Sequence, residues 1–390
     1  MSANPVVTRR PPPWRDVRVL RVVLQLAFLA GVGLLVLFLY FNLTASLRRL
    51  GIQTGWGWLD EPSGFAIPDS DFRSSQPISD ALIEGAVNTL KVSALGIVLA
   101  TILGVVVGVA RLSTNWLVRK AAAAFVETIR NIPVLVIIIF WYLAVLLRLP
   151  PISSAVEWGD LLVLSNRGLV VPKIVGEGDQ AVFGVFLVAG LAAAVAAWIW
   201  RTRRFDATGE PHHRVLWSGG VVLAVALVGF FAGGMPLAVS LPERGDLGTR
   251  EGFRLAPEYA ALLIALVLYT ASHIAEIVRG SILAVHRGQG EAADALGLSG
   301  FQRLRLVILP QAFRIMIPPL ANQFLNLTKN SSLGVAISYY EVTRVTRIAV
   351  SQAAPAPQAF AVLMAIYLFF SLTIAAITNL VDRRLAYKGR

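Results

Sequence analysis

The chain of 390 residues is 56% hydrophobic and only 15% charged, which excludes an ordinary soluble globular protein of this length. It contains no cysteine, so a disulfide framework and a thiolate metal site are excluded as well. A net charge of +12 would suit a nucleic-acid-binding protein. In so apolar a chain, however, basic residues are better explained as the topology signals of a membrane protein, with membrane lipid rather than nucleic acid around it.

Eight charge-poor windows are long enough to cross a bilayer, whose hydrocarbon core takes about 20 apolar residues of helix. We therefore predict an all-α integral membrane protein with about eight transmembrane helices. The first window is too long for a signal peptide and lacks a small-residue cleavage site after it, so we expect it to be retained. The windows are 22–47, 92–110, 131–147, 181–200, 215–242, 259–275, 315–340 and 348–381.

Arginine and lysine are distributed unequally between the two sets of loops, and the richer set is expected on the cytoplasmic side. This set includes both tails, so both termini are predicted to be cytoplasmic. Its segments are 9–21, 111–120, 201–214, 279–314 and 383–390.

Residues 289–310, QGEAADALGLSGFQRLRLVILP, form a polar, glycine-punctuated segment between two apolar windows. Glu291 and Asp294 are expected in the first turn of a short helix, where acids suit the positive end of the helix dipole. Gly297 is expected to end that helix in a left-handed turn.

A second helix should follow, because Ser299 and Gln302 have the spacing of a capping box. Pro310 is expected to end this helix or to kink it. The two helices would offer a small surface for another protein at the cytoplasmic face. An ordinary connecting loop would show the same local pattern.

The run EAADALG followed by ILP resembles the EAA loop of binding-protein-dependent ABC transporter permeases. The runs NTLKVSALGIVLATILGVVVGVARLS, FVETIRNIPVLVIIIFWY and HIAEIVRGSILAVHRGQG resemble the polar amino-acid branch of this family. The resemblance covers about residues 86–148 and 258–385, and it implies the type I ABC importer permease fold. In that family the loop forms a coupling helix that docks in a groove of the cytoplasmic ATPase. The docking surface implied here consists of Glu291, Ala292, Ala293, Gly297 and Pro310.

The resemblance also implies a division of the chain. Compact members of the branch lack most of residues 149–257, which would form inserted external loops and a two-helix transmembrane hairpin. The core would then consist of 86–148 and of 258–390, the latter with the EAA loop. Residues 1–85 would supply a basic tail, the first transmembrane helix and an external loop. This longer N-terminal half resembles the larger general or acidic/amide amino-acid permeases.

Lys329 is the only basic residue within its apolar window. A charge in hydrocarbon costs several kcal/mol, so the side chain should face protein or a watery path. We expect contact with the carboxylate of an amino-acid substrate, with Asn330 and Ser332 adding hydrogen-bonding groups. The alternatives are that the lysine bonds helix-end carbonyls or extends to the membrane interface.

Two acid–arginine pairs stand at i, i+3 spacing near predicted cytoplasmic helix ends, and we expect each to form a structural ion pair. They are Glu127 with Arg130 and Glu276 with Arg279. His273 is expected either to line the substrate path or to be a satisfied interhelical histidine.

Motifs of catalysis are absent from the sequence, as is the phosphate-binding loop GxxxxGK[ST]. We therefore expect no enzyme activity, metal or cofactor in this chain, and expect a partner ATPase to bind the ATP. The expected partners are that ATPase, a second permease chain in a homo- or heterodimer, and a periplasmic amino-acid-binding protein, all at the bacterial inner membrane. An ion-coupled secondary transporter and a non-transporting membrane scaffold or receptor are the alternatives.

Overall fold

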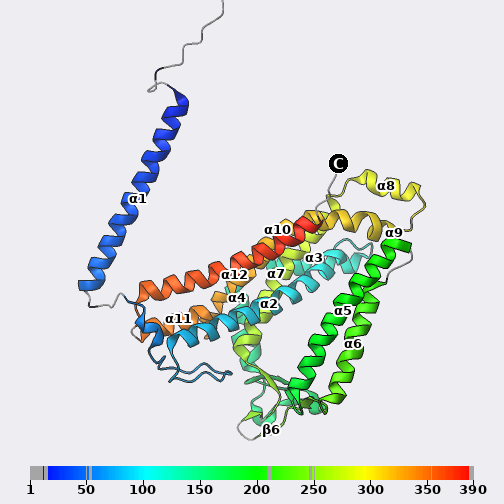
Figure 1. The fold of residues 1–390 in the computed structure, drawn as a ribbon, viewed down its shortest axis with the longest axis horizontal. Coiled ribbons are helices and arrows are strands. Elements are labelled where there is room, and N and C mark those ends of the chain that lie inside the picture. Colours follow the sequence, from blue (N-terminus) through cyan, green and yellow to red (C-terminus); the bar gives the residue numbers. More distant parts are fainter. Residues whose placement is uncertain are drawn as a thin grey trace, which may run out of the picture.

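The computed structural model describes residues 12, 16–49, 51, 55–208, 213–245, 248–249, 251–352 and 354–385. The outermost parts of both basic tails, on which the predicted orientation partly depends, lie outside these residues. Helices dominate the fold (Figure 1). They are α1 (Val17–Arg49), α2 (Ile78–Ala110), α3 (Trp116–Asn131), α4 (Val134–Ile139), α5 (Gln180–Thr208), α6 (Arg214–Ala232), α7 (Pro257–Leu283), α8 (Arg287–Ala295), α9 (Gly300–Arg303), α10 (Leu309–Asn330), α11 (Val342–Ser351) and α12 (Ala356–Leu385).

Seven helices of the described chain are long and apolar enough to cross a membrane, and an eighth span exists if the bent pair α3–α4 is counted as one. The sixth of the seven joins α9, α10 and the 3₁₀ segment η7 (Ser331–Ile337) into one helical run, Gly300–Ile337. The predicted number of spans therefore agrees with the fold, although several boundaries do not.

The predicted window 131–147 is wrong at its start, because the chain bends by 104° between α3 and α4. Pro133 precedes α4 and has no N–H to continue the helix of α3, and the residue before a proline avoids helical geometry. Window 215–242 is too long, since α6 ends at Ala232 before a glycine turn. Window 348–381 merges α11 with α12, which are separate helices.

The core forms where α2 and α7 lie along each other. Gly104 and Gly108 of α2 permit this approach: a Cβ added at Gly104 would lie 2.6 Å from the Cβ of Ile274, and one at Gly108 would lie 2.7 Å from the carbonyl oxygen of Ala275. Small residues give membrane helices their close packing, because lipid offers no hydrophobic drive for association. α3, α4, α10 and α11 pack around this pair.

Eight short strands lie at one end of the described structure, which we call the strand end; the opposite end carries α8 and is called the α8 end (Figure 1). None of the strands was predicted, because they are too short to show an alternating pattern. β1 (Val156–Glu157), β2 (Val163–Ser165), β3 (Gly168–Val171) and β8 (Phe253–Leu255) form an antiparallel sheet, β4 (Lys173–Gly176) pairs with β5 (Leu237–Ser240), and β6 (Arg244–Gly245) pairs with β7 (Gly248–Thr249).

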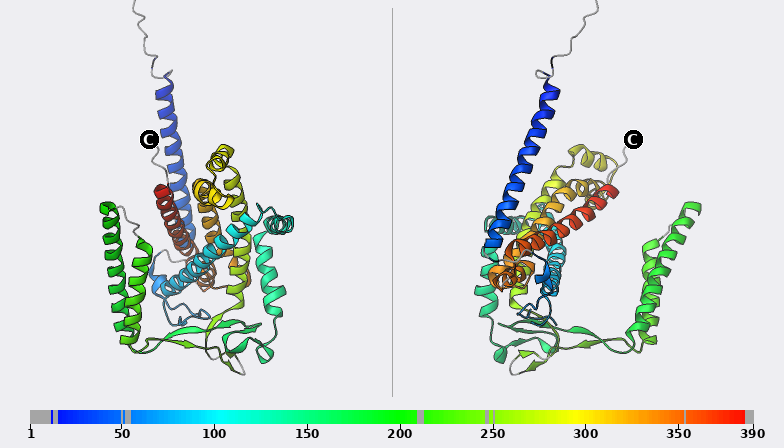
Figure 2. Two further views of the ribbon diagram at one scale, coloured as in Figure 1. Left: turned by 90° about the vertical axis from the view of Figure 1, so that its right-hand side faces the viewer. Right: turned by 60° about the vertical axis from the view of Figure 1, so that its left-hand side comes forward.

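The hairpin α5–α6 stands apart from the helical core, to which it is joined through the strand end (Figure 2). Its two helices contact each other extensively and contact no other described helix extensively. Gly229 of α6 lies against Phe186 of α5, where an added Cβ would be only 2.3 Å from the Cβ of the phenylalanine. The hairpin is therefore a separate packing unit.

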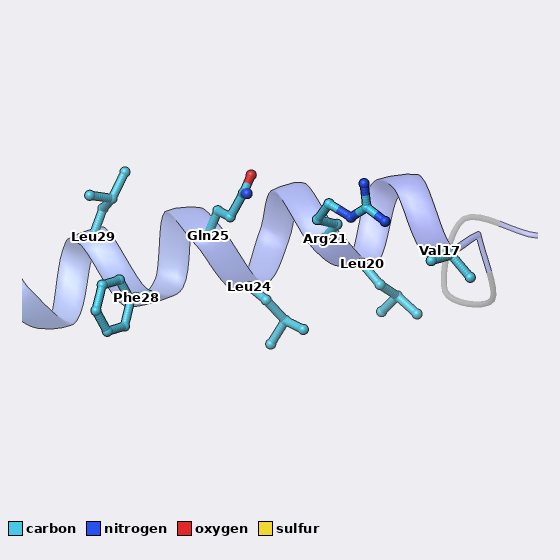
Figure 3. Close-up of a pocket in the computed structure, with 7 residues that line it drawn as sticks. All are labelled: Val17, Leu20, Arg21, Leu24, Gln25, Phe28 and Leu29. Carbon is cyan, nitrogen blue, oxygen red and sulfur yellow. The ribbon is translucent and has the colours of Figure 1, made fainter. Parts of the chain in front are cut away.

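Helix α1 also lies largely apart from the described core, and its apolar window is 0% buried. A groove of about 730 Å³ runs along it, lined by Val17, Leu20, Arg21, Leu24, Gln25, Phe28 and Leu29 (Figure 3). All seven side chains come from this one helix, so the groove is a corrugation of an exposed helix surface and not an enclosed site.

Candidate coupling loop and translocation path

The short helix α8 projects from the α8 end beyond the rest of the core (Figure 1). It begins at Arg287, earlier than predicted, because the imidazole Nδ1 of His286 accepts a hydrogen bond from the N–H of Gly288 at 3.1 Å and caps the helix. Glu291 is therefore in the second turn, and Asp294 is near the end. Their expected position in the first turn is wrong.

Gly297 ends α8 with φ of +73°. The N–H of Leu298 donates to the carbonyl of Ala293 at 3.1 Å, and the N–H of Gly297 donates to the carbonyl of Asp294 at 3.0 Å. These two bonds are those of a Schellman motif, which requires the left-handed geometry that glycine adopts most easily. The predicted glycine turn is confirmed.

The second helix begins as predicted, with a capping box between Ser299 and Gln302. It does not end at Pro310, however. A π-helical turn, η6 (Leu304–Ile308), lies just before the proline, and the helical run continues into α10. Hydrogen bonds in a π-helical turn do not follow the regular i to i+4 pattern of an α-helix. The missing N–H of Pro310 therefore interrupts no regular series of α-helical hydrogen bonds.

The predicted docking residues differ in exposure. Glu291, Ala292, Gly297 and Pro310 are exposed, whereas Ala293 is buried, with 2% of its surface accessible. Ala293 therefore supports α8 from within and is not available to a partner. The surface also carries three large apolar side chains that the motif did not indicate, Leu296, Phe301 and Leu306. Exposed apolar groups of this size suit contact with a partner protein or with the membrane.

Two polar contacts fasten α8 to the start of the α9–α10 run. Arg303 contacts the carboxylate of Asp294 at 2.6 Å, and the side-chain amide of Gln311 donates to that of Gln289 at 3.2 Å. These contacts tie α8 to a helix that is long and apolar enough to cross the membrane. We call Gly300–Ile337 the lever helix.

Lys329 lies in the last turn of α10, at the far end of the lever helix, and its side chain is exposed in the single chain. No hydrogen bond of its ammonium group is found within the described residues, so the predicted alternative of a carbonyl-bonded lysine has no support there. The hydroxyl of Ser332 instead donates to the carbonyl of Lys329 at 2.7 Å. Asn330 is half-buried beside it.

Asn322 and Asn326 are exposed on the same side of α10 as Lys329, and sequence reasoning missed them. Their spacing of four and three residues puts all three on one face of the helix. We call Asn322, Asn326 and Lys329 the polar stripe. The i, i+4, i+7 pattern of polar residues is present in the sequence and is the signal by which the stripe can be found.

The predicted ion pairs near the α8 end differ from each other. Arg279 contacts Glu276 at 2.6 Å, at the expected spacing. The second partner of Glu276 is Arg111 at the end of α2, which joins the two central helices. Within the described chain no ion pair joins Glu127 to Arg130, although they have the same i, i+3 spacing, and both side chains are exposed.

His273 lies between these charges. It borders a polar cavity of about 410 Å³ together with Arg111, Glu127, Arg130 and Glu276. Its ring stands edge-on to Tyr269 at 4.8 Å between centroids, and its buried Nε2 has no hydrogen-bond partner in the described chain. The alternative of a fully satisfied histidine is therefore wrong for the single chain.

A second cavity, of about 510 Å³, opens near the strand end between the starts of α2 and α7. Charges of both signs border it, including Lys91, Arg254 and Glu258. The carboxylate of Glu258 accepts from the hydroxyl of Tyr142 at 2.9 Å. Tyr339, which also borders the cavity, is buried, and its burial raises the pKa of the phenol above its usual range.

Glu341, close to this cavity, is fully buried. Its carboxylate accepts from the N–H groups of Thr343 and Arg344 and from the hydroxyl of Tyr367, at 2.8–3.0 Å. Burial raises the pKa of Glu341, and these hydrogen bonds oppose the shift. The residue joins α11 to α12.

A bundle of membrane-spanning helices, with a projecting helix tied to one span and polar cavities at both ends, defines a membrane transport protein. The family model of the binding-protein-dependent transport system inner membrane component matches residues 220–387. The chain is 38% identical to the general L-amino acid transport system permease protein AapQ of Rhizobium johnstonii, over 97% of this chain and 94% of that protein.

Two further relatives are similar over nearly the whole chain. The putative amino-acid ABC transporter permease protein YhdX of Escherichia coli is 41% identical over 94% of this chain and 93% of its own length. The glutamate/glutamine/aspartate/asparagine transport system permease protein BztB of Rhodobacter capsulatus is 35% identical over 95% of this chain and 94% of its own. The chain therefore belongs to the permease family of binding-protein-dependent amino-acid ABC transporters. Such a permease is a multi-pass component of the bacterial inner membrane and works with an ATPase and a substrate-binding protein.

Proposed function

We propose that this chain carries polar L-amino acids across the inner membrane, with glutamate, glutamine, aspartate and asparagine among them. The relatives named for general L-amino acids and for these four amino acids support this substrate class. The structural observation that carries the proposal is the lever helix, which joins the exposed α8 at one end to the polar stripe at the other.

In this mechanism the ATPase grips Glu291, Ala292 and Gly297 together with the exposed apolar side chains beside them. Closure of the ATPase dimer moves α8, and the lever helix tilts with it. The change is a rigid-body switch between two states, driven by the preference of the ATP-bound partner for one of them. Pro310 lies at the start of α10, between α8 and the part of the lever helix that would span the membrane.

The polar stripe would line the path of the substrate through the membrane. Three exposed polar side chains on a spanning helix are unfavourable against lipid, so they face a second permease chain or water between two chains. We infer that two permease chains, identical or similar, bring their stripes together. The ammonium group of Lys329 would then attract the substrate carboxylate, with Asn330 and Ser332 nearby and His273 bordering the path closer to the α8 end.

We propose that the α8 end and both termini lie in the cytoplasm, because the loops richer in arginine and lysine are expected on that side. A reporter fused after Arg204 is then cytoplasmic, and one fused after Glu243 is external. The opposite labelling would show that the hairpin has the reverse orientation in the membrane, and it would contradict the cytoplasmic position proposed for the docking surface.

The decisive experiment measures amino-acid uptake per assembled complex in vesicles that contain the permease, its ATPase and its binding protein. Lys329→Met should abolish uptake while ATPase binding and basal ATP hydrolysis persist, and Lys329→Arg should retain part of the uptake. Lys173→Met, an exposed lysine of β4, is the matched control and should behave as wild type. Normal uptake per complex in Lys329→Met would refute the path assignment.

The same vesicles separate this proposal from ion-coupled transport. Uptake should require ATP inside the compartment that holds the ATPase, and should persist when ion gradients are collapsed. Uptake that follows an imposed ion gradient without ATP would identify a secondary transporter.

A further inference from the structure

The hairpin α5–α6 is chemically asymmetric along its length. Residues 181–200 carry no charged side chain, and at about 1.5 Å per residue this run is about 30 Å long, the thickness of the hydrocarbon core. The first arginine, Arg201, therefore stands at a membrane boundary. The hairpin end toward the strands has the acids Glu177 and Asp179 instead.

Three tryptophans mark the same boundary. Trp198, Trp200 and Trp217 are 40%, 51% and 50% exposed, on two helices that contact only each other extensively. Tryptophan prefers the level of the lipid headgroups, where the ring is partly in the apolar layer and its N–H reaches polar groups.

Arginines stack on these rings across the two helices. The guanidinium carbon of Arg201, on α5, lies 5.0 Å from the ring centroid of Trp217 on α6. That of Arg214, on α6, lies 4.7 Å from the ring centroid of Trp198 on α5. Two reciprocal stacks therefore hold two guanidinium groups at fixed positions at the membrane boundary. We call these four residues the Trp–Arg clamp.

Stacking uses the face of a guanidinium, whereas phosphate oxygens accept hydrogen bonds from the N–H groups at its edge. Arg203, which is exposed, and Arg204 add positive charge close to the clamp. Segment 201–214 holds four arginines against the two acids Asp206 and Glu210. Its charge complements a phosphate group.

We propose that the Trp–Arg clamp binds the phosphate headgroup of anionic phospholipids. The surroundings select a lipid rather than a soluble phosphate, because the rings beside the guanidinium groups continue into an apolar helix surface that acyl chains would cover. The hairpin, which makes no extensive contact with the other described helices, would thereby be held at a fixed depth while the lever helix moves. This inference does not depend on the proposed substrate.

The test titrates the purified full-length chain in detergent micelles with phosphatidylglycerol and, separately, with phosphatidylcholine of the same acyl chains. Retention of each lipid is followed by native mass spectrometry. We expect phosphatidylglycerol to bind about tenfold more tightly than phosphatidylcholine. Equal binding of the two lipids would overturn the proposal.

Two double variants locate the binding. Arg201→Gln with Arg214→Gln should weaken phosphatidylglycerol binding about tenfold, whereas Arg119→Gln with Lys120→Gln, which removes the same charge from exposed positions of α3, should leave it unchanged. An equal effect of both pairs would show nonspecific charge attraction and overturn the site.

A third double variant, which preserves both positive charges, tests whether misfolding of the hairpin explains a loss of lipid binding. Arg201→Lys with Arg214→Lys should keep most of the phosphatidylglycerol binding, because the positive charges remain. If the lysine pair loses as much binding as the glutamine pair, packing of the hairpin rather than headgroup charge is responsible, and the proposal is wrong. Inorganic phosphate should not displace the lipid; displacement would identify a soluble phosphate site instead.

Discussion

Helices α7 and α5 are both long, apolar and able to span a membrane, yet they have opposite surroundings. In α7, 56% of the spanning window is buried inside the protein, against 11% in α5. The buried helix is the less apolar of the two, since Thr270, Ser272 and Ser281 lie in its protein-facing side. Lipid accepts an apolar surface all round, whereas a helix in the core must fit its neighbours with small and hydrogen-bonded groups.

The difference extends to function. The cavities, the ion pairs of Glu276 and the lever helix all lie in or against the core that contains α7. The described residues of the hairpin border neither of these cavities, and they carry the Trp–Arg clamp at one end. The core can therefore be expected to determine transport, and the hairpin to determine placement in the membrane.

Replacement of one glycine by valine in the core and of one in the hairpin should test the difference between the two regions most directly. Gly104→Val inserts a branched side chain where even a Cβ would be 2.6 Å from Ile274, so we expect almost no assembled, transport-competent protein. Gly229→Val opens the hairpin at Phe186 but leaves the core contacts intact. Membrane abundance and uptake per molecule measure both. If Gly229→Val is as damaging as Gly104→Val, the two regions are not independent.

Substitution of Gly297 should separate docking from folding of the core. A Cβ at this position meets no atom of the chain within 4 Å, so Gly297→Asp leaves the core packing unchanged. We expect uptake to fall at least tenfold, because a charged side chain enters the docking surface and the left-handed turn is strained.

Gly297→Asn is the control, since asparagine tolerates the left-handed geometry and adds no charge. It should retain more ATPase capture than the aspartate variant, at equal abundance. Full transport by Gly297→Asp with the ATPase still bound would remove α8 from coupling.

A matched leucine pair measures burial alone. Leu266 of α7 is 0% exposed and Leu191 of α5 is 58% exposed. Leu266→Ala should cost about 2–5 kcal/mol of unfolding free energy and lower the melting temperature. Leu191→Ala, on a surface that lipid covers, should change it by less than about 0.5 kcal/mol. Equal shifts in a thermal melt would indicate that a partner chain buries α5 as well.

The smallest effect should come from Glu341. Its pKa is raised by burial, so the folded state favours the protonated form. The stability from this group is then fully present below the unfolded-state pKa of about 4.3 and is lost as pH rises through the folded value. Glu341→Gln should flatten this decline in a series of melts between pH 4 and 7. Exposed Glu127→Gln is the control, and a decline that persists unchanged in Glu341→Gln would contradict the assignment.

The sequence by itself determined that this is a membrane protein with several spanning helices, because repeated charge-free runs of about 20 residues are the length of helix that crosses the hydrocarbon core. It also predicted the turn at Gly297 and the capping box at Ser299, since both depend on contacts within a few residues. These are local rules, and local rules can be read from a string of residues.

Only the tertiary structure decided which apolar helix faces protein and which faces lipid. It also paired Glu276 with Arg111 across 165 positions of the chain. The inward position of Ala293 likewise depended on how α8 packs against α9 and η6. Hydropathy measures how a segment partitions from water, and that quantity is the same whether the apolar surface is covered by lipid or by another helix.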